Sequence, residues 1–274
     1  MAPWNLSERY ETPHGTVRWT SWGQGSPVVF LHGTPFSSYV WRDIAAGFST
    51  RHTVFLWDLL GYGQSEMREG QDVSLAAQGR IFTELLTHWG LTDPLVVAHD
   101  FGGTVALRAH LLHGARYRKL TLVDPVALAP WGSSFFRLVS EHSTAFGQLP
   151  PALHRALVRE YVSSASSPGL HPATLERLIE PWLGERGQPA FYRQIAQAHQ
   201  RYTDEIQDLY DTIDIPVLVC WGADDTWVPA TKGHELTSRI TDARLRLIPT
   251  AGHLVQEDAP AQLTGALTDF LDAP

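Results

Sequence analysis

Short apolar runs alternate with longer amphipathic stretches along most of this chain. Five runs are rich in β-branched residues and apolar on both faces, as expected for strands buried in a parallel sheet: residues 27–31, 53–57, 94–98, 120–123 and 216–221. Residues 245–248 predict a further strand late in the chain. Helical spacing of apolar residues predicts helices over 73–89, from 101 to about 112, and over 260–271. This alternation predicts an α/β fold with a mostly parallel, doubly wound sheet and a site at the carboxyl ends of its strands.

The alternation stops between residues 126 and 211. That segment is rich in Leu, Ala and His, shows no strand pattern, and contains helical patterns interrupted by proline and glycine. Because it lies between two predicted strands of one sheet, we expect it to be a helical lid inserted over the site. Residues 1–125 and 212–274 would then form the core domain, with residues 126–211 as the cap.

Composition restricts the class of partner. The 274 residues are 43% hydrophobic and 18% charged, and the formal net charge is −8. No basic patch is evident, so nucleic acid and anionic membranes are poor partners. We expect a small-molecule substrate and a monomer or homodimer.

The single cysteine and the N-terminal sequence indicate a compartment. Cys220 lies within an apolar run and has no second cysteine to pair with, so we expect it to be a buried core residue in a reducing environment. The N-terminal segment lacks the apolar stretch of a signal peptide, and no run is long enough to span a bilayer. These features predict a cytoplasmic protein.

The segment from Leu95 to Thr104, Leu-Val-Val-Ala-His-Asp-Phe-Gly-Gly-Thr, carries the most informative chemistry. An apolar strand runs into a glycine-containing turn that opens a helix, the context of a nucleophile elbow. Such elbows usually present Ser, whereas this one presents Asp100. A carboxylate needs no deprotonation and can attack an sp³ carbon to form an enzyme ester. We therefore expect Asp100 to be a nucleophile.

A histidine and an acid follow Asp100 in the order expected for such a site. His253 lies in a Gly-preceded loop after the last predicted strand, which favours a general base. Asp225 follows the predicted strand 216–221 and would orient the imidazole of His253. Asp124, at the end of the 120–123 strand, is an alternative acid, although a turn-forming role before Pro125 is preferred.

The loop of residues 32–36 follows the first buried strand and would aim a backbone N–H at the site. The N–H groups of Thr34 and Phe101 would together form an oxyanion hole. The Thr34–Pro35 bond is a candidate cis peptide, since cis bonds occur mainly before proline. We expect His32 and His99 to have structural rather than catalytic roles.

No cofactor or metal site is predicted. His110 and His113 are three residues apart at the end of the predicted helix after the elbow, without the spacing or the Glu of a zincin motif. The glycine-containing segment 61–65 is better interpreted as a turn after a strand than as a dinucleotide loop. We therefore expect a cofactor-free enzyme.

Five motifs together resemble the α/β-hydrolase superfamily over nearly the whole chain outside the lid. They are His32-Gly-Thr-Pro, Asp58-Leu-Leu-Gly-Tyr-Gly-Gln-Ser, His99-Asp-Phe-Gly-Gly, Trp221-Gly-Ala-Asp-Asp-Thr-Trp-Val-Pro and Ala251-Gly-His. Within that superfamily, an Asp in the third motif resembles epoxide hydrolases and the haloalkane and haloacetate dehalogenases. This resemblance implies a two-step reaction in which Asp100 is alkylated and water activated by His253 hydrolyses the ester.

Residues that differ from the usual motifs of those families favour some of the candidate reactions over others. Haloalkane dehalogenases usually carry Trp after the nucleophile and often Asn in the loop motif, where this chain has Phe101 and Thr34. Haloacetate dehalogenases usually have Arg after the nucleophile. Epoxide hydrolysis is therefore the leading interpretation and carbon–halogen hydrolysis the alternative. A diverged protein that binds a ligand or catalyses a non-hydrolytic biosynthetic step is a third possibility.

The resemblance also suggests leaving-group residues in the lid. Tyr192, in Phe-Tyr-Arg, resembles the segment where epoxide hydrolases keep a ring-opening tyrosine. His142 lies where a second lid tyrosine usually occurs and fits either chemistry. Trp131 and Trp182 could donate indole N–H groups to a halide, although core packing is the simpler role for both.

Overall fold

The computed structural model describes residues 4–273, and within this range the strands form one sheet in the order β1-β2-β4-β3-β5-β6-β7-β8. The strands are β1 (Glu8–Thr12), β2 (Gly15–Gly23), β3 (Ser26–Leu31), β4 (His52–Trp57), β5 (Leu95–His99), β6 (Lys119–Val123), β7 (Val217–Gly222) and β8 (Arg244–Ile248). Strands β3 to β8 pair in parallel, whereas β1 and β2 are antiparallel to their neighbours. The mostly parallel sheet predicted from the sequence is confirmed.

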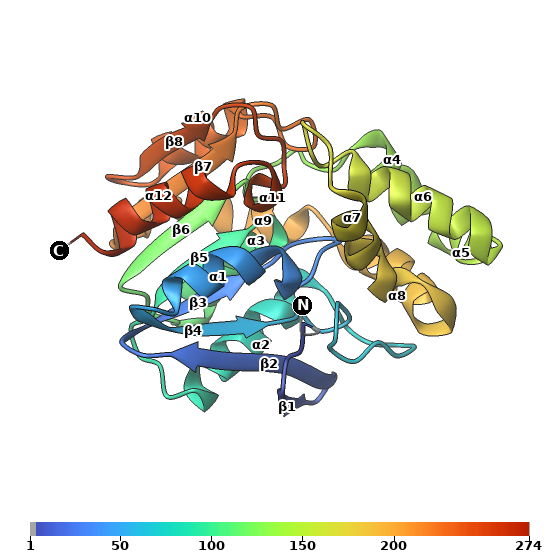
Figure 1. Cartoon of the computed structure of the whole chain (residues 1–274), viewed down its shortest axis with the longest axis horizontal. Coiled ribbons are helices and arrows are strands. Elements are labelled where there is room, and N and C mark those ends of the chain that lie inside the picture. Colours follow the sequence, from blue (N-terminus) through green and yellow to red (C-terminus); the bar gives the residue numbers. More distant parts are fainter. Residues whose placement is uncertain (1–3, 274) are drawn as a thin grey trace.

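Helices cover both faces of this sheet. The core helices are α1 (Arg42–Phe48), α2 (Leu75–His88), α3 (Phe101–His113), α10 (Thr231–Arg239), α11 (Val255–Asp258) and α12 (Pro260–Leu271), with a 3₁₀ turn, η1, at Ser38–Trp41. Figure 1 shows α1 and α12 in front of the sheet and α2 and α3 behind it, and each of these pairs is in contact. Two-sided coverage explains why every residue of β5 and β6 is buried.

The segment between β6 and β7 is helical. It contains α4 (Ser134–Glu141), α5 (Ser143–Gly147), α6 (Pro151–Ser163), α7 (Pro172–Ile179), α8 (Gly184–Gln197) and α9 (Arg201–Gln207), with 3₁₀ turns at Glu180–Trp182 (η2) and Tyr210–Thr212 (η3). We call residues 126–211 the helical insertion. In Figure 1, α4 to α8 gather at the right, at the end of the sheet toward which β4 points.

Several core elements were not predicted from the sequence, among them β1, β2, α1 and α10. Strands β1 and β2 form a half-exposed antiparallel edge, in which exposed and partly buried residues interrupt any continuous apolar run. Helix α1 is short, and α10 buries only Gly233 and Leu236, so neither offers a long apolar stripe.

Helix α2 illustrates how the predicted elements form. The Ser74 side chain accepts a hydrogen bond from the Ala77 N–H (3.3 Å) and begins the helix. Ile81, Phe82 and Leu85 then recur at helical spacing and are buried.

Cys220 is fully buried in β7, which confirms it as a core residue. Among the helices of residues 4–273, none combines the length and the apolar character that a membrane span requires.

Candidate active site

Asp100 lies at the tight turn between β5 and α3. Its backbone has φ 50° and ψ −119°, a strained conformation for a residue with a side chain. Gly33 approaches closely, because a Cβ at that position would lie 2.3 Å from the Asp100 Cβ. A glycine is therefore required at position 33 so that the loop after β3 can lie against the Asp100 carboxylate.

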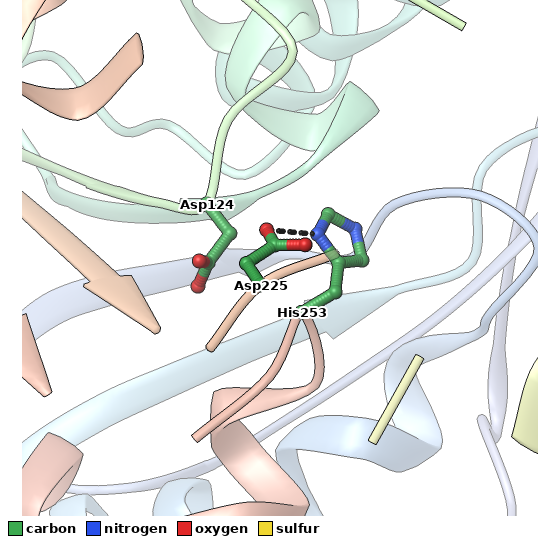
Figure 2. A group of neighbouring side chains, drawn as sticks. All are labelled: Asp124, Asp225 and His253. Atoms are coloured by element: carbon green, nitrogen blue, oxygen red, sulfur yellow. Dashed lines mark hydrogen bonds and ion pairs between the residues drawn. The ribbon is translucent and has the colours of Figure 1, made fainter. Parts of the chain in front are cut away.

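Three residues that the sequence predicted to act together are in contact. The His253 Nδ1 donates to Asp225 Oδ2 (2.8 Å), and its Nε2 faces Asp100 Oδ1 (3.2 Å). All three side chains are buried. Figure 2 shows the His253 imidazole beside the Asp225 carboxylate. The other Asp225 oxygen accepts the backbone N–H groups of Trp227 (2.8 Å) and Val228 (3.0 Å), which hold the acid in place.

The charge of His253 depends on both carboxylates. Burial alone lowers the pKa of this histidine, but Asp225 and Asp100 outweigh that effect and raise the pKa well above its ordinary value. His253 is therefore an imidazolium between two carboxylates. Removing the negative charge of Asp100 would remove part of the attraction that retains the proton.

The second Asp100 oxygen lies in a backbone N–H pair. Asp100 Oδ2 accepts hydrogen bonds from the Thr34 N–H (3.1 Å) and the Phe101 N–H. These are the two groups that the sequence proposed for an oxyanion hole. The Thr34–Pro35 peptide is cis, as predicted.

His32 and His99 have structural contacts, as expected from the sequence. The Leu59 N–H donates to His32 Nε2 (2.9 Å). His99 Nε2 donates to the His253 carbonyl oxygen (2.9 Å) and so supports the loop that carries His253. Burial and the neighbouring His253 lower the pKa of His99 to about 3, which keeps its ring neutral.

The alternative acid, Asp124, does not contact His253 through a hydrogen bond. Its Oδ1 accepts the Gly222 N–H (2.8 Å), while Oδ2 is buried without a partner in the described residues. Burial, and then the nearby Asp225 charge, raise the pKa of Asp124 well above its ordinary value. Asp225 is thus the acid that hydrogen-bonds His253, and Asp124 lies behind it as a carboxyl group whose burial favours protonation.

Ligand atoms of Asp124, Asp225 and His253 lie within 4.8 Å of one another, a separation that a metal site could have (Figure 2). A metal-bound imidazole must be unprotonated at its ligand nitrogen. In this cluster His253 Nδ1 already donates to Asp225. The geometry therefore fits proton handling by an acid–histidine pair.

The two acids are expected to respond differently to the same substitution. Asp225→Asn should lower kcat for the native reaction by about 10²–10⁴-fold, because an amide no longer stabilises the imidazolium. Asp124→Asn should keep kcat within about threefold, because the amide carbonyl can still accept from Gly222. Steady-state kinetics of both variants test this, and an equally large loss in both would contradict it.

A small cavity of about 40 Å³ adjoins Asp100. Its apolar lining comprises Phe101, Val126, Trp131, Phe136, Trp227 and Val228. Typical small-molecule sites measure about 300–1,000 Å³. Substrate binding is therefore expected to require movement of side chains or of the helical insertion.

Tyr161 lines the same cavity, although sequence analysis assigned it no role. Its ring, carried by α6, stacks on Trp227 (centroids 4.5 Å apart), and Trp227 in turn stacks on His253 (5.1 Å). Burial, with a contribution from the Asp100 charge, raises the pKa of the Tyr161 phenol well above its ordinary value. Tyr161 is thus a protonated phenol that lines the same cavity as the Asp100 carboxylate.

The proposed leaving-group roles of Tyr192 and His142 need correction. The Tyr192 hydroxyl donates to His154 Nδ1 (2.8 Å), and Tyr192 does not line the Asp100 cavity. His142 is exposed at the junction of α4 and α5. The aromatic-Tyr-Arg pattern therefore marks a packing residue of the insertion in this chain.

The two tryptophans also direct their N–H groups elsewhere. The Trp182 indole donates to the Pro35 carbonyl oxygen (2.5 Å). The Trp131 indole donates to Thr203 Oγ1 (2.9 Å), although its ring lines the cavity. Trp131 can contact an apolar substrate, but neither indole is free to bind a halide in this structure.

The fold and this constellation define the class of protein. Residues 28–266 match the model of the alpha/beta hydrolase family, and the chain belongs to that family. The predicted superfamily and fold are therefore confirmed.

Relatives extend over nearly the whole chain. An alpha/beta hydrolase fold protein from Burkholderia ambifaria, of known crystal structure, is 47% identical over 97% of this chain and 98% of its own, with a TM-score of 0.94. Haloalkane dehalogenase 2 from Mycobacterium bovis is 25% identical, covering 96% of this chain and 94% of that protein. A cis-3-alkyl-4-alkyloxetan-2-one decarboxylase from Xanthomonas campestris is 24% identical, covering 90% and 89%.

Proposed function

We propose that the protein hydrolyses a hydrophobic small molecule through an alkyl ester on Asp100, and that the substrate is an epoxide. The observation that carries the proposal is the placement of the two carboxylate oxygens. Oδ2 is held by the Thr34 and Phe101 N–H groups, while Oδ1 faces His253. A carboxylate in this position can act as a nucleophile without first losing a proton.

In the first step, Asp100 Oδ1 forms a bond to an epoxide carbon, and the bond between that carbon and the ring oxygen breaks. The released alkoxide takes a proton from a donor in the cavity. In the second step, His253 removes a proton from water, which attacks Asp100 Cγ. The negative charge then develops on Oδ2 between the two backbone N–H groups, and collapse of this intermediate releases the diol and restores the carboxylate.

The charges around His253 support this order of events. Alkylation converts Asp100 from a carboxylate to a neutral ester, which removes one of the two charges that raise the pKa of His253. The imidazolium then loses its proton more readily, and that proton returns to the cavity donor that had protonated the alkoxide. His253 thus becomes a base only after the ester has formed.

The donors near Asp100 favour an epoxide over a halide. Tyr161 supplies a phenol O–H at the cavity, suited to an alkoxide leaving group. The indoles of Trp131 and Trp182 donate to other groups, and the Phe101 side chain has no N–H or O–H donor. This replaces Tyr192 by Tyr161 as the ring-opening residue.

Two other reactions remain candidates because of named relatives. The Mycobacterium bovis relative is a haloalkane dehalogenase, and carbon–halogen cleavage would use the same Asp100 ester. The Xanthomonas campestris relative acts on an oxetan-2-one, a strained four-membered cyclic ester. Such a ring has an sp³ carbon bonded to the ring oxygen, as an epoxide does, and could undergo the same attack without hydrolysis as the outcome.

A matched panel of electrophiles tests the proposed reaction. Wild-type enzyme is incubated with 1,2-epoxyhexane, 1-bromohexane and p-nitrophenyl hexanoate, and diol, bromide and nitrophenol are quantified. Diol is expected to form fastest. Bromide release without diol would favour the dehalogenase, and nitrophenol alone would contradict an Asp100 alkyl ester.

Tyr161→Phe is expected to slow turnover of 1,2-epoxyhexane by about 10²-fold, because the alkoxide loses its proton donor. Tyr192→Phe is the matched control and should change this rate by less than about threefold. Measuring kcat/KM for both variants tests the assignment. A larger loss in Tyr192→Phe than in Tyr161→Phe would restore the assignment made from the sequence.

A further inference from the structure

Three polar side chains from distant segments form a buried cluster beside the Asp100 loop. Gln194 Oε1, on α8 of the helical insertion, accepts the Thr34 hydroxyl (2.7 Å) and the Tyr62 hydroxyl (2.9 Å). Gln194 and Tyr62 are each 2% exposed and Thr34 is 4% exposed. The cluster therefore joins the insertion to the two loops that follow β3 and β4.

The cluster contains more polar hydrogens than its own hydrogen bonds use. The Gln194 Nε2 has no hydrogen-bond partner within residues 4–273. The two hydroxyls and the amide carry four polar hydrogens, and the two hydrogen bonds use two of them. Exchanging the amide oxygen and nitrogen still leaves a free donor, because the amide would then donate to both hydroxyls and, even if one hydroxyl donates to the other, one hydroxyl hydrogen lacks an acceptor. Buried donors without acceptors are costly, and they occur mainly where a ligand or water supplies the acceptor.

The cluster meets the Asp100 carboxylate through Thr34, which lines the Asp100 cavity, whereas Gln194 and Tyr62 are not among the residues that line it in this structure. The Thr34 backbone N–H holds Asp100 Oδ2 (3.1 Å), while the Thr34 side chain holds Gln194. Burial raises the pKa of the Tyr62 phenol, which keeps it a protonated donor. No negatively charged side chain hydrogen-bonds to Gln194 in the described residues, which leaves the cluster neutral.

We infer that Gln194, with Thr34 and Tyr62, forms a specificity site that, once the movement that admits substrate has opened the cavity toward Gln194, binds an oxygen atom carried on or next to the substrate carbon that Asp100 attacks. The inference rests on the proposed function for the identity of the attacked carbon. A neutral donor pair discriminates strongly against a substrate that lacks the acceptor, because the buried donors then remain unpaired. An oxygen-bearing electrophile is thus selected over a plain alkyl halide.

Two substitutions on α8 separate this role from a structural one. Gln194→Met has similar length and no donor. Gln188→Met is the matched control, since the Gln188 amide is buried on the same helix but donates to the Gly147 (3.2 Å) and Leu149 (2.7 Å) carbonyl oxygens. Both changes are made in the His253→Gln background, where an Asp100 ester should persist. Intact mass then reports the rate of adduct formation with 1,2-epoxyhexane and with 1-bromohexane.

Gln194→Met should slow adduct formation with 1,2-epoxyhexane by about tenfold or more, as expected for loss of one hydrogen bond to a developing charge, and change the rate with 1-bromohexane by less than about twofold. Gln188→Met should affect both probes equally and weakly. Equal slowing of both probes by Gln194→Met, or no slowing of either, would overturn the specificity site.

Equilibrium binding separates failure of this inference from failure of the proposed function. The dissociation constant of 1,2-hexanediol is measured by calorimetry for otherwise wild-type protein, Gln194→Met and Gln188→Met. Weaker diol binding in Gln194→Met alone, without adduct formation in any variant, would retain the oxygen site and reject the Asp100 ester. Adduct formation with unchanged diol binding and unchanged rates would retain the ester and reject the oxygen site.

Discussion

His253→Gln is expected to convert the enzyme into one that reacts once with its substrate and then stops. Asp100 can still attack, because its carboxylate needs no base. Hydrolysis of the ester should fall by about 10²–10⁴-fold, since glutamine cannot remove a proton from water. The glutamine amide can still contact Asp225, which limits damage to the loop.

Mass spectrometry measures this result. After incubation with an accepted epoxide, the peptide containing Asp100 should gain the full mass of the epoxide, whereas the wild-type peptide should show little adduct. His142→Gln is a suitable control, because His142 is exposed and away from the Asp100 cavity. A full turnover rate in His253→Gln, with no adduct, would contradict the two-step reaction.

The parts of the fold that the sequence predicts well are those buried on two sides. Strands β3 to β7 pair in parallel and are largely buried between helical layers, so their apolar runs are easy to recognise. The β1–β2 edge was missed because its exposed and partly buried positions resemble a loop in a single sequence. The pattern of apolar residues reveals a strand through its burial, and β1 and β2 are only partly buried.

Local motifs predict the part of the candidate site formed by the sheet loops, but they do not predict the part formed by the helical insertion. Asp100, Asp225 and His253 each follow a strand of the parallel sheet, so the topology itself brings them to one edge. Tyr161 and Tyr192 are both aromatic residues on insertion helices, and no local signal distinguishes them. Which of the two meets the cavity depends on how α6 and α8 pack.

The cluster of Gln194, Thr34 and Tyr62 likewise depends on contacts between distant segments that sequence motifs do not predict. Its three members come from the loops after β3 and β4 and from α8, and each is unremarkable in its own segment. A sequence motif cannot reveal a surplus of donors, because the surplus exists only once the side chains meet.

Asp100→Ser is expected to exchange one chemistry for another. A serine at this strained turn would face His253 and the N–H groups of Thr34 and Phe101, the arrangement that activates Ser for acyl transfer. Alkylation by epoxides should fall by more than about 10³-fold, because a neutral hydroxyl is a poor nucleophile toward an sp³ carbon. Release of nitrophenol from p-nitrophenyl hexanoate should rise at least several-fold above wild type. In the wild type, His253 is already protonated and the Asp100 carboxylate has no proton to give, so this general-base activation of a hydroxyl nucleophile does not occur.

Asp100→Ala separates the two effects, since it removes the nucleophile without supplying another. It should lose epoxide turnover as completely as Asp100→Ser and should gain no esterase activity. Thermal melting of both variants shows whether the elbow remains folded. Epoxide turnover by Asp100→Ala at a near-normal rate would end the covalent mechanism, because no other carboxylate of the cluster has access to the cavity: Asp225 is bonded to His253 and to the backbone of its own loop, and Asp124 lies behind it.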